Sequence, residues 1–120
     1  MTKEAYCSYE VAKLLKEKGF NEECYRFYEY DTKEFYKESI PCCNSRSDDY
    51  ACPTHQMAMA WLRERGWFIE VHVSVDLNGK YHFMYMILDK ACKCVMNGKH
   101  KDTYEESIEE ALKYSLENLI

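Results

Sequence analysis

The chain is poor in glycine and proline, with four and two respectively among its 120 residues. The few glycines form no phosphate-cradling loop, which argues against a nucleotide-binding fold. No apolar run approaches the ~18 residues that a membrane span requires, and no apolar leader stands at the N-terminus. We therefore expect one cytoplasmic domain over residues 1–120 that contacts no membrane.

Positive charge is also in deficit, because 16 Lys and Arg face 21 Asp and Glu, for a formal net charge of -5. This balance repels polyanions and makes nucleic acid an unlikely partner. The seven cysteines are an odd number without Cys-x-x-Cys spacing, so we expect reduced thiols rather than a disulfide framework. We expect Cys7 and Cys24 to serve as small core residues.

What the chain does have is a self-similarity at one fixed offset. Residues 11–20 and 58–67 align without a gap, 47 positions apart. In each segment two large apolar residues precede a basic-acidic-basic triplet, a glycine and an aromatic residue. Such a pattern is consistent with an internal duplication of a helix followed by two strands.

The local signals predict three helices and two hairpins. Helices are expected from Ser8 to Lys18, from Pro53 or Thr54 to Gly66, and from Thr103 to the C-terminus, each opened by a capping side chain. The Tyr-rich segment from Cys24 to Tyr36 is expected to form a hairpin. The resulting fold is α+β, with one antiparallel sheet of about four strands and helices on one face. The element order is α-β-β-α-β-β-α, with an αββ unit at 1–40, a second at 53–90 and a final helix at 103–120.

The second hairpin is expected to close on a two-residue turn at Asn78-Gly79, between strands 67–75 and 81–88. This register pairs Val75 with His82 and gives one almost wholly apolar face. The opposite face then carries a row of aromatic and polar side chains: Glu70, His72, Tyr81, Phe83 and Tyr85. We predict that this row binds a protein partner or a second copy, unless the last helix covers it. A single-stranded nucleic acid stacked on the rings is an alternative.

A cluster of possible metal ligands or reactive thiols surrounds the start of the second helix. It comprises Cys42, Cys43, Cys52 and His55. These types are zinc ligands, and Cys52 with His55 also resembles a thiol with a nearby base. Because the spacing is unspecific, we expect no metal and no cofactor, and a small metal- or thiol-dependent enzyme stays an alternative.

Several runs resemble those of small uncharacterised proteins encoded by phages and prophages of gut bacteria. The runs are residues 53–58, 61–64 and 110–120. The resemblance implies a phage accessory context in the cytoplasm of a bacterial host, and it brings no catalytic residue. Together with the acidic charge and the aromatic row, it favours a non-enzymatic protein-interaction module that binds another protein or a second copy of the chain.

Overall fold

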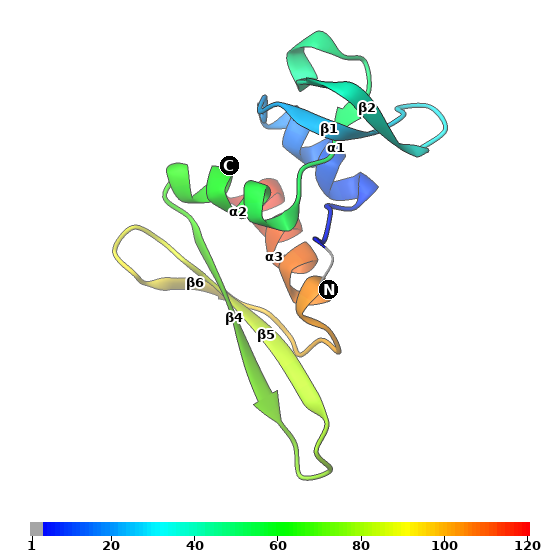
Figure 1. Ribbon diagram of the computed structural model, residues 1–120. Coiled ribbons are helices and arrows are strands. Elements are labelled where there is room, and N and C mark those ends of the chain that lie inside the picture. Colours follow the sequence, from blue (N-terminus) through cyan, green and yellow to red (C-terminus); the bar gives the residue numbers. More distant parts are fainter. Residues whose placement is uncertain (1–3) are drawn as a thin grey trace.

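The computed structural model describes residues 4–120 as an α+β protein built from three helices and two sheets (Figure 1). The helices are α1 (Tyr9–Glu17), α2 (His55–Glu64) and α3 (Tyr104–Asn118). A short 3-10 helix, η1, spans Asn44–Arg46. None of the helices in the described part of the chain is long and apolar enough to cross a membrane.

Each sheet has three antiparallel strands. The first contains β1 (Cys24–Tyr28), β2 (Phe35–Cys42) and β3 (Tyr50–Ala51), in the order β2-β1-β3. The second contains β4 (Phe68–Val75), β5 (Tyr81–Leu88) and β6 (Cys94–Asn97), in the order β4-β5-β6. The predicted α+β class is confirmed.

The prediction of a single sheet of about four strands is wrong. Two short strands, β3 and β6, were absent from the prediction, and each adds to one of the hairpins. Each hairpin thus belongs to a three-stranded sheet of its own, and within residues 4–120 no strand of one sheet pairs with a strand of the other. Strand β3 lies in the connection between β2 and α2, where Pro41 and a run of Asn, Ser and Asp predict irregular structure.

The two similar segments do form the same local structure. Gly19 and Gly66 both have positive φ, at 97° and 88°. The aromatic residue after each glycine donates its backbone N–H to the helix, Phe20 to Leu15 and Trp67 to Leu62. This is the C-terminal cap in which a glycine adopts the left-handed conformation. Beyond the caps the halves differ, because the first strand is central in one sheet and the second strand is central in the other.

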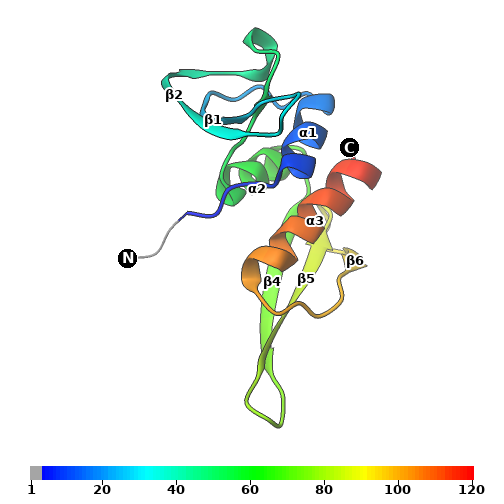
Figure 2. The same cartoon turned by 90° about the vertical axis from the view of Figure 1, so that its right-hand side faces the viewer.

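The helices lie between the two sheets and share the main core (Figures 1 and 2). Helices α1 and α3 pack side by side, and α3 also lies against β4 and β5. The spacing of its apolar residues predicts a buried stripe, and Ile108, Ala111, Leu112, Ser115 and Leu116 are buried, whereas Leu119 of the same stripe is half-buried. The C-terminal helix is thus docked, and it fixes the second sheet against the rest of the molecule.

The far end of the β4–β5 hairpin extends past α3 and stands clear of the helices (Figures 1 and 2). We call residues 72–84 the arm. Within residues 4–120, the strands of the arm make backbone pairs only with each other, apart from a bridge between Phe83 and Lys101. The nine consecutive residues 72–80, around the tip of the arm, are accordingly all exposed.

Candidate functional site

The turn of the arm differs from the predicted one by a single residue. Asp76 pairs with Lys80 across a three-residue loop, Leu77-Asn78-Gly79, and only Gly79 has positive φ, at 81°. The Asp76 side chain accepts hydrogen bonds from the backbone N–H groups of Asn78 and Lys80, at 2.9 and 3.0 Å. A two-residue type I′ turn needs positive φ at both positions, which Asn78 does not adopt. The aspartate therefore stabilises the longer loop.

This shift of one residue changes which side chains share a face. Val75 pairs with Tyr81, Val73 with Phe83 and Val71 with Tyr85. The valines and the aromatic row thus lie on the same face, and the predicted pairing of Val75 with His82 is wrong. Because side chains alternate along a strand, a slip of one position moves a whole set to the other face.

The predicted aromatic row is consequently buried at one end and exposed at the other. Tyr85 is 1% exposed and packs against Ala111 of α3, so its predicted place on a free surface is wrong. Phe83 is half-buried, with its ring edge against Tyr104. Only Tyr81, which is 62% exposed, remains open to a partner. A platform of three adjacent rings for stacked bases is therefore not available.

The two polar residues predicted with that row lie on the opposite face of the sheet. Glu70 and His72 are both exposed, with 3.6 Å between the carboxylate and the imidazole. Their strand neighbours across the sheet are Met86 and Met84. The structure therefore separates the polar and aromatic members of the predicted binding set.

An exposed apolar surface takes the place of the predicted row. It consists of four side chains of the arm, each at least 59% exposed: Val73, Val75, Leu77 and Tyr81. We call it the arm face. Single exposed apolar residues are ordinary, but a contiguous set at a projecting tip is typical of a contact site.

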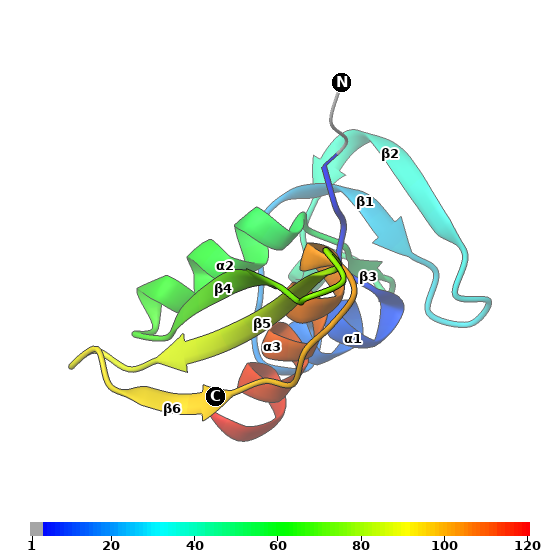
Figure 3. The ribbon, with the colours of Figure 1, turned by 90° about the horizontal axis from the view of Figure 1, so that it is seen from below.

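The backbone edge beside the arm face is also open. Strand β4 is an outer strand of its sheet, with β5 on its only paired side (Figure 3). Asp76, the residue just after β4, donates its N–H to the Lys80 carbonyl, so position 76 is hydrogen-bonded across the hairpin. Bonded positions recur at every second residue, so the even-numbered residues of β4 bond to β5. Alternation then directs the backbone groups of Val73 and Val75 outward. An unprotected outer strand of this kind is a template for pairing with another strand.

The predicted cysteine cluster is not assembled. Cys42 and Cys43 lie at the end of β2, where the Cys43 thiol contacts Ser45 and Arg46 at 3.4 and 3.3 Å. Cys52 is buried, and its thiol donates to the Cys7 carbonyl at 3.1 Å. Within residues 4–120, no metal-ligand group includes any of these three cysteines. His55 alone belongs to such a group.

Two other side chains, those of Cys7 and Glu109, lie close to His55. Its Nε2 lies 2.8 Å from a carboxylate oxygen of Glu109 on α3, and that oxygen also accepts the Ser8 N–H at 2.8 Å. The ligand atoms of Cys7, His55 and Glu109 all lie within 4.8 Å of one another. They come from the segment before α1, the first turn of α2 and the middle of α3, so no local spacing in the sequence links them.

The pKa values of Cys7, Glu109 and neighbouring Cys52 are shifted by their surroundings. Burial, aided by nearby Cys52 and Glu109, raises the pKa of the Cys7 thiol well above its ordinary value. Burial also acts to raise the pKa of Glu109, but hydrogen bonds from His55 and Ser8 outweigh it, and the net pKa is lowered. Burial similarly raises the pKa of Cys52 to about 12. Neither buried thiol is therefore a nucleophile at neutral pH, since the thiolate is the reactive form.

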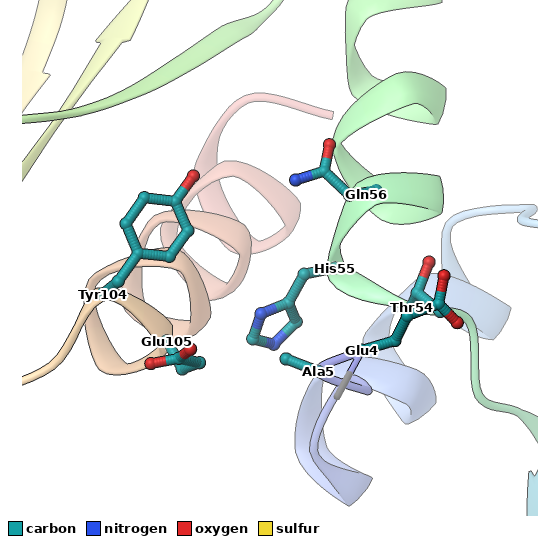
Figure 4. A pocket seen from close by; sticks show the side chains of 7 residues that line it. All are labelled: Glu4, Ala5, Thr54, His55, Gln56, Tyr104 and Glu105. Carbon is teal, nitrogen blue, oxygen red and sulfur yellow. The ribbon is translucent and has the colours of Figure 1, made fainter. Parts of the chain in front are cut away.

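Two surface cavities open beside this set. One, of about 210 Å³, is lined by His55 together with Thr54, Tyr104 and Glu105 (Figure 4). The other, of about 430 Å³, is lined by His55, Glu109 and further carboxylates of α3. The imidazole is thus reached from solvent, although its side chain is only 7% exposed.

Comparisons with protein-family models, with curated proteins and with solved structures found no match to this chain. Its function is therefore argued from its own residues.

Proposed function

We propose that this protein is a non-enzymatic protein-interaction module that binds through its arm. The observation that carries the proposal is the arm face, where Val73, Val75, Leu77 and Tyr81 are all more than half exposed at the end of a projecting hairpin. Burying such side chains is worth about 25 cal/mol for each Å² removed from water. A partner that covers the tip gains this energy together with the backbone pairing offered by β4.

The partner that fits this surface is a second copy of the chain. Two β4 strands related by a two-fold axis pair in antiparallel fashion, edge to edge, and form one continuous sheet. The outward backbone groups of Val73 in one copy then bond to those of Val75 in the other. The valines of both copies lie on one face, so the arm faces merge into a single apolar surface.

The charges on β4 select the position of the axis. An axis at Ser74 places His72 opposite Asp76 of the second copy, and no like charges lie directly opposite each other. An axis at Val73 instead opposes Glu70 to Asp76, and two carboxylates so placed are destabilising. Ser74 also centres the pairing on the most exposed stretch of β4, away from the half-buried Ile69 and Val71. We therefore assign the axis to Ser74.

Light scattering across a protein concentration series tests this proposal. The paired stretch is short, and stable interfaces bury about 800 Å² for each partner, so we expect a weak dimer. The mass should rise from 14.4 kDa toward twice that value between about 10 µM and about 1 mM protein. Val75→Lys should abolish the rise, because it places a charge in the centre of the merged face.

The matched control is Ile40→Lys. Ile40 lies on β2, an outer strand of the other sheet, and is 75% exposed. The same chemical change there should leave the concentration dependence intact. A mass of 14.4 kDa at every concentration, or equal effects of the two variants, would overturn the proposal. We also propose a phage accessory context for the interaction, which the sequence resemblance alone supports.

A further inference from the structure

We infer that Cys7, His55 and Glu109 form a zinc-binding site that joins the N-terminal segment, α2 and α3. The observation is their convergence, with one sulfur, one imidazole nitrogen and one carboxylate oxygen all within 4.8 Å of one another. A sulfur and an imidazole nitrogen together select zinc over magnesium or calcium, which prefer oxygen ligands alone. The site is independent of the arm and of the proposed self-association.

The distances fit after small side-chain movements. Zinc bonds of 2.0–2.3 Å in tetrahedral geometry place ligand atoms about 3.4 Å apart. The His55–Glu109 contact of 2.8 Å must therefore open by about 0.6 Å when zinc replaces the shared hydrogen bond. The remaining separations must close by about 1.4 Å at most. Rotation of the Glu109 side chain adjusts the two separations that involve its carboxylate, because its second oxygen is not used by His55 or Ser8. Rotation of the Cys7 and His55 side chains about χ1 must close the third.

The surroundings favour a cation and leave space for a fourth ligand. The cavity of about 430 Å³ beside His55 and Glu109 is lined by three further glutamates of α3 and a single lysine, Lys101. One of these glutamates, Glu105, lies one turn before Glu109 and also lines the neighbouring cavity. Figure 4 shows the His55 ring in the space between Glu105 and Ala5. A water molecule or Glu105 completes the tetrahedron from this side.

Binding exchanges protons in a defined way. The Cys7 thiol releases its proton to solvent as the sulfur–zinc bond forms, His55 binds through a ring nitrogen that carries no proton and Glu109 through a carboxylate oxygen, and nothing is oxidised or reduced. Because the three ligands belong to separate segments, the ion binds only the folded chain. At 100-fold excess of free zinc over the dissociation constant, we expect the melting temperature to rise by about 10 °C for a chain of this length.

The test combines metal content with cobalt spectroscopy on the full, reduced chain. Apo protein, prepared with a chelator, is titrated with zinc while the melting temperature is followed, and separately with Co²⁺. We expect one ion for each chain and a thiolate-to-cobalt charge-transfer band. Cys7→Ser should remove the band. Glu109→Gln, which keeps an oxygen acceptor for Ser8, should weaken zinc binding at least tenfold.

Two controls distinguish this site from adventitious binding. Cys52→Ser changes the adjacent buried thiol and should leave the band unchanged. Replacing exposed Cys92 and Cys94 by serine should also have no effect. The inference fails if the wild-type chain binds no stoichiometric zinc, or if the cobalt band depends on Cys92 and Cys94. If Cys7→Ser does not fold, Glu109→Gln decides, because unaltered zinc affinity in that variant contradicts the site.

Discussion

The register of the second hairpin predicts that alanine substitutions at Tyr85, Phe83 and Tyr81 lower the free energy of unfolding by very different amounts, in decreasing order. Among residues 4–120, Tyr85 is the largest side chain that is less than 2% exposed, and its replacement by alanine leaves a cavity beneath α3. Losses of about 3–5 kcal/mol are typical of such aromatic truncations. Phe83→Ala removes a half-buried ring and its edge contact with Tyr104, for about 1–2 kcal/mol. Tyr81→Ala, at an exposed position, should change stability by no more than about 0.5 kcal/mol.

Equilibrium urea unfolding of the three variants measures this gradient. The protein concentration is kept at a few micromolar, where self-association does not contribute. A chain of this size is stable by roughly 6–18 kcal/mol, so the Tyr85 effect is a large part of the total. In the two-residue-turn register all three rings point away from the valine face. Equal and small losses at Tyr81, Phe83 and Tyr85 would therefore refute the register and the arm face derived from it.

Three further predictions follow from the same contacts. Gly98→Ala should destabilise the fold by about 1–3 kcal/mol, because the added Cβ would overlap the Tyr85 ring. A melting temperature equal to that of the wild type would contradict the packing of Tyr85 against Gly98. In metal-free protein, Glu109→Gln should cost about 1–3 kcal/mol at pH 6 and progressively less as the pH falls below 4.5, since a carboxylate with a lowered pKa stabilises the fold above its unfolded value near 4.5 and loses this effect as pH falls through the folded pKa. A cost of Glu109→Gln that does not change with pH in urea unfolding would exclude a stabilising Glu109 carboxylate. Iodoacetamide should label exposed Cys92 and Cys94 rapidly in the native state, as read out by mass spectrometry. Rapid labelling of Cys7, Cys24 or Cys52 would contradict the burial of these thiols.

The parts of the fold that depend on neighbouring residues could be predicted from the sequence. Ser8, Thr54 and Thr103 cap the three helices as expected, because each cap is a contact over three positions. The glycine stops at Gly19 and Gly66 are equally local. The hairpin register was not predictable from Asn78-Gly79 alone, because the Asp76 side chain stabilises a longer loop through two hydrogen bonds. Here a side chain just outside the turn changed the outcome.

The candidate sites depend on contacts between segments far apart in the chain, and the sequence alone does not predict these contacts. The sequence predicts His55 as a possible ligand, but it predicts Cys42, Cys43 and Cys52 as the partners. Its actual neighbours are Cys7 and Glu109, 48 and 54 positions away, and only the packing of α3 against the starts of α1 and α2 brings them together. The exposed arm face likewise follows from how far the hairpin extends past α3. No periodicity within residues 67–88 encodes that length.

Disulfide trapping at Ser74 tests the proposed interaction most directly, in a chain whose exposed Cys92 and Cys94 are replaced by serine. A two-fold axis at Ser74 places the two introduced cysteines of Ser74→Cys about 4.5 Å apart between Cα atoms, within the range of a disulfide. In the control His72→Cys the two positions are about 13 Å apart, too far to bridge. Under mild oxidation, Ser74→Cys should give a covalent dimer on a non-reducing gel and His72→Cys should stay monomeric. Equal cross-linking of both variants, or none in either, would contradict pairing through β4.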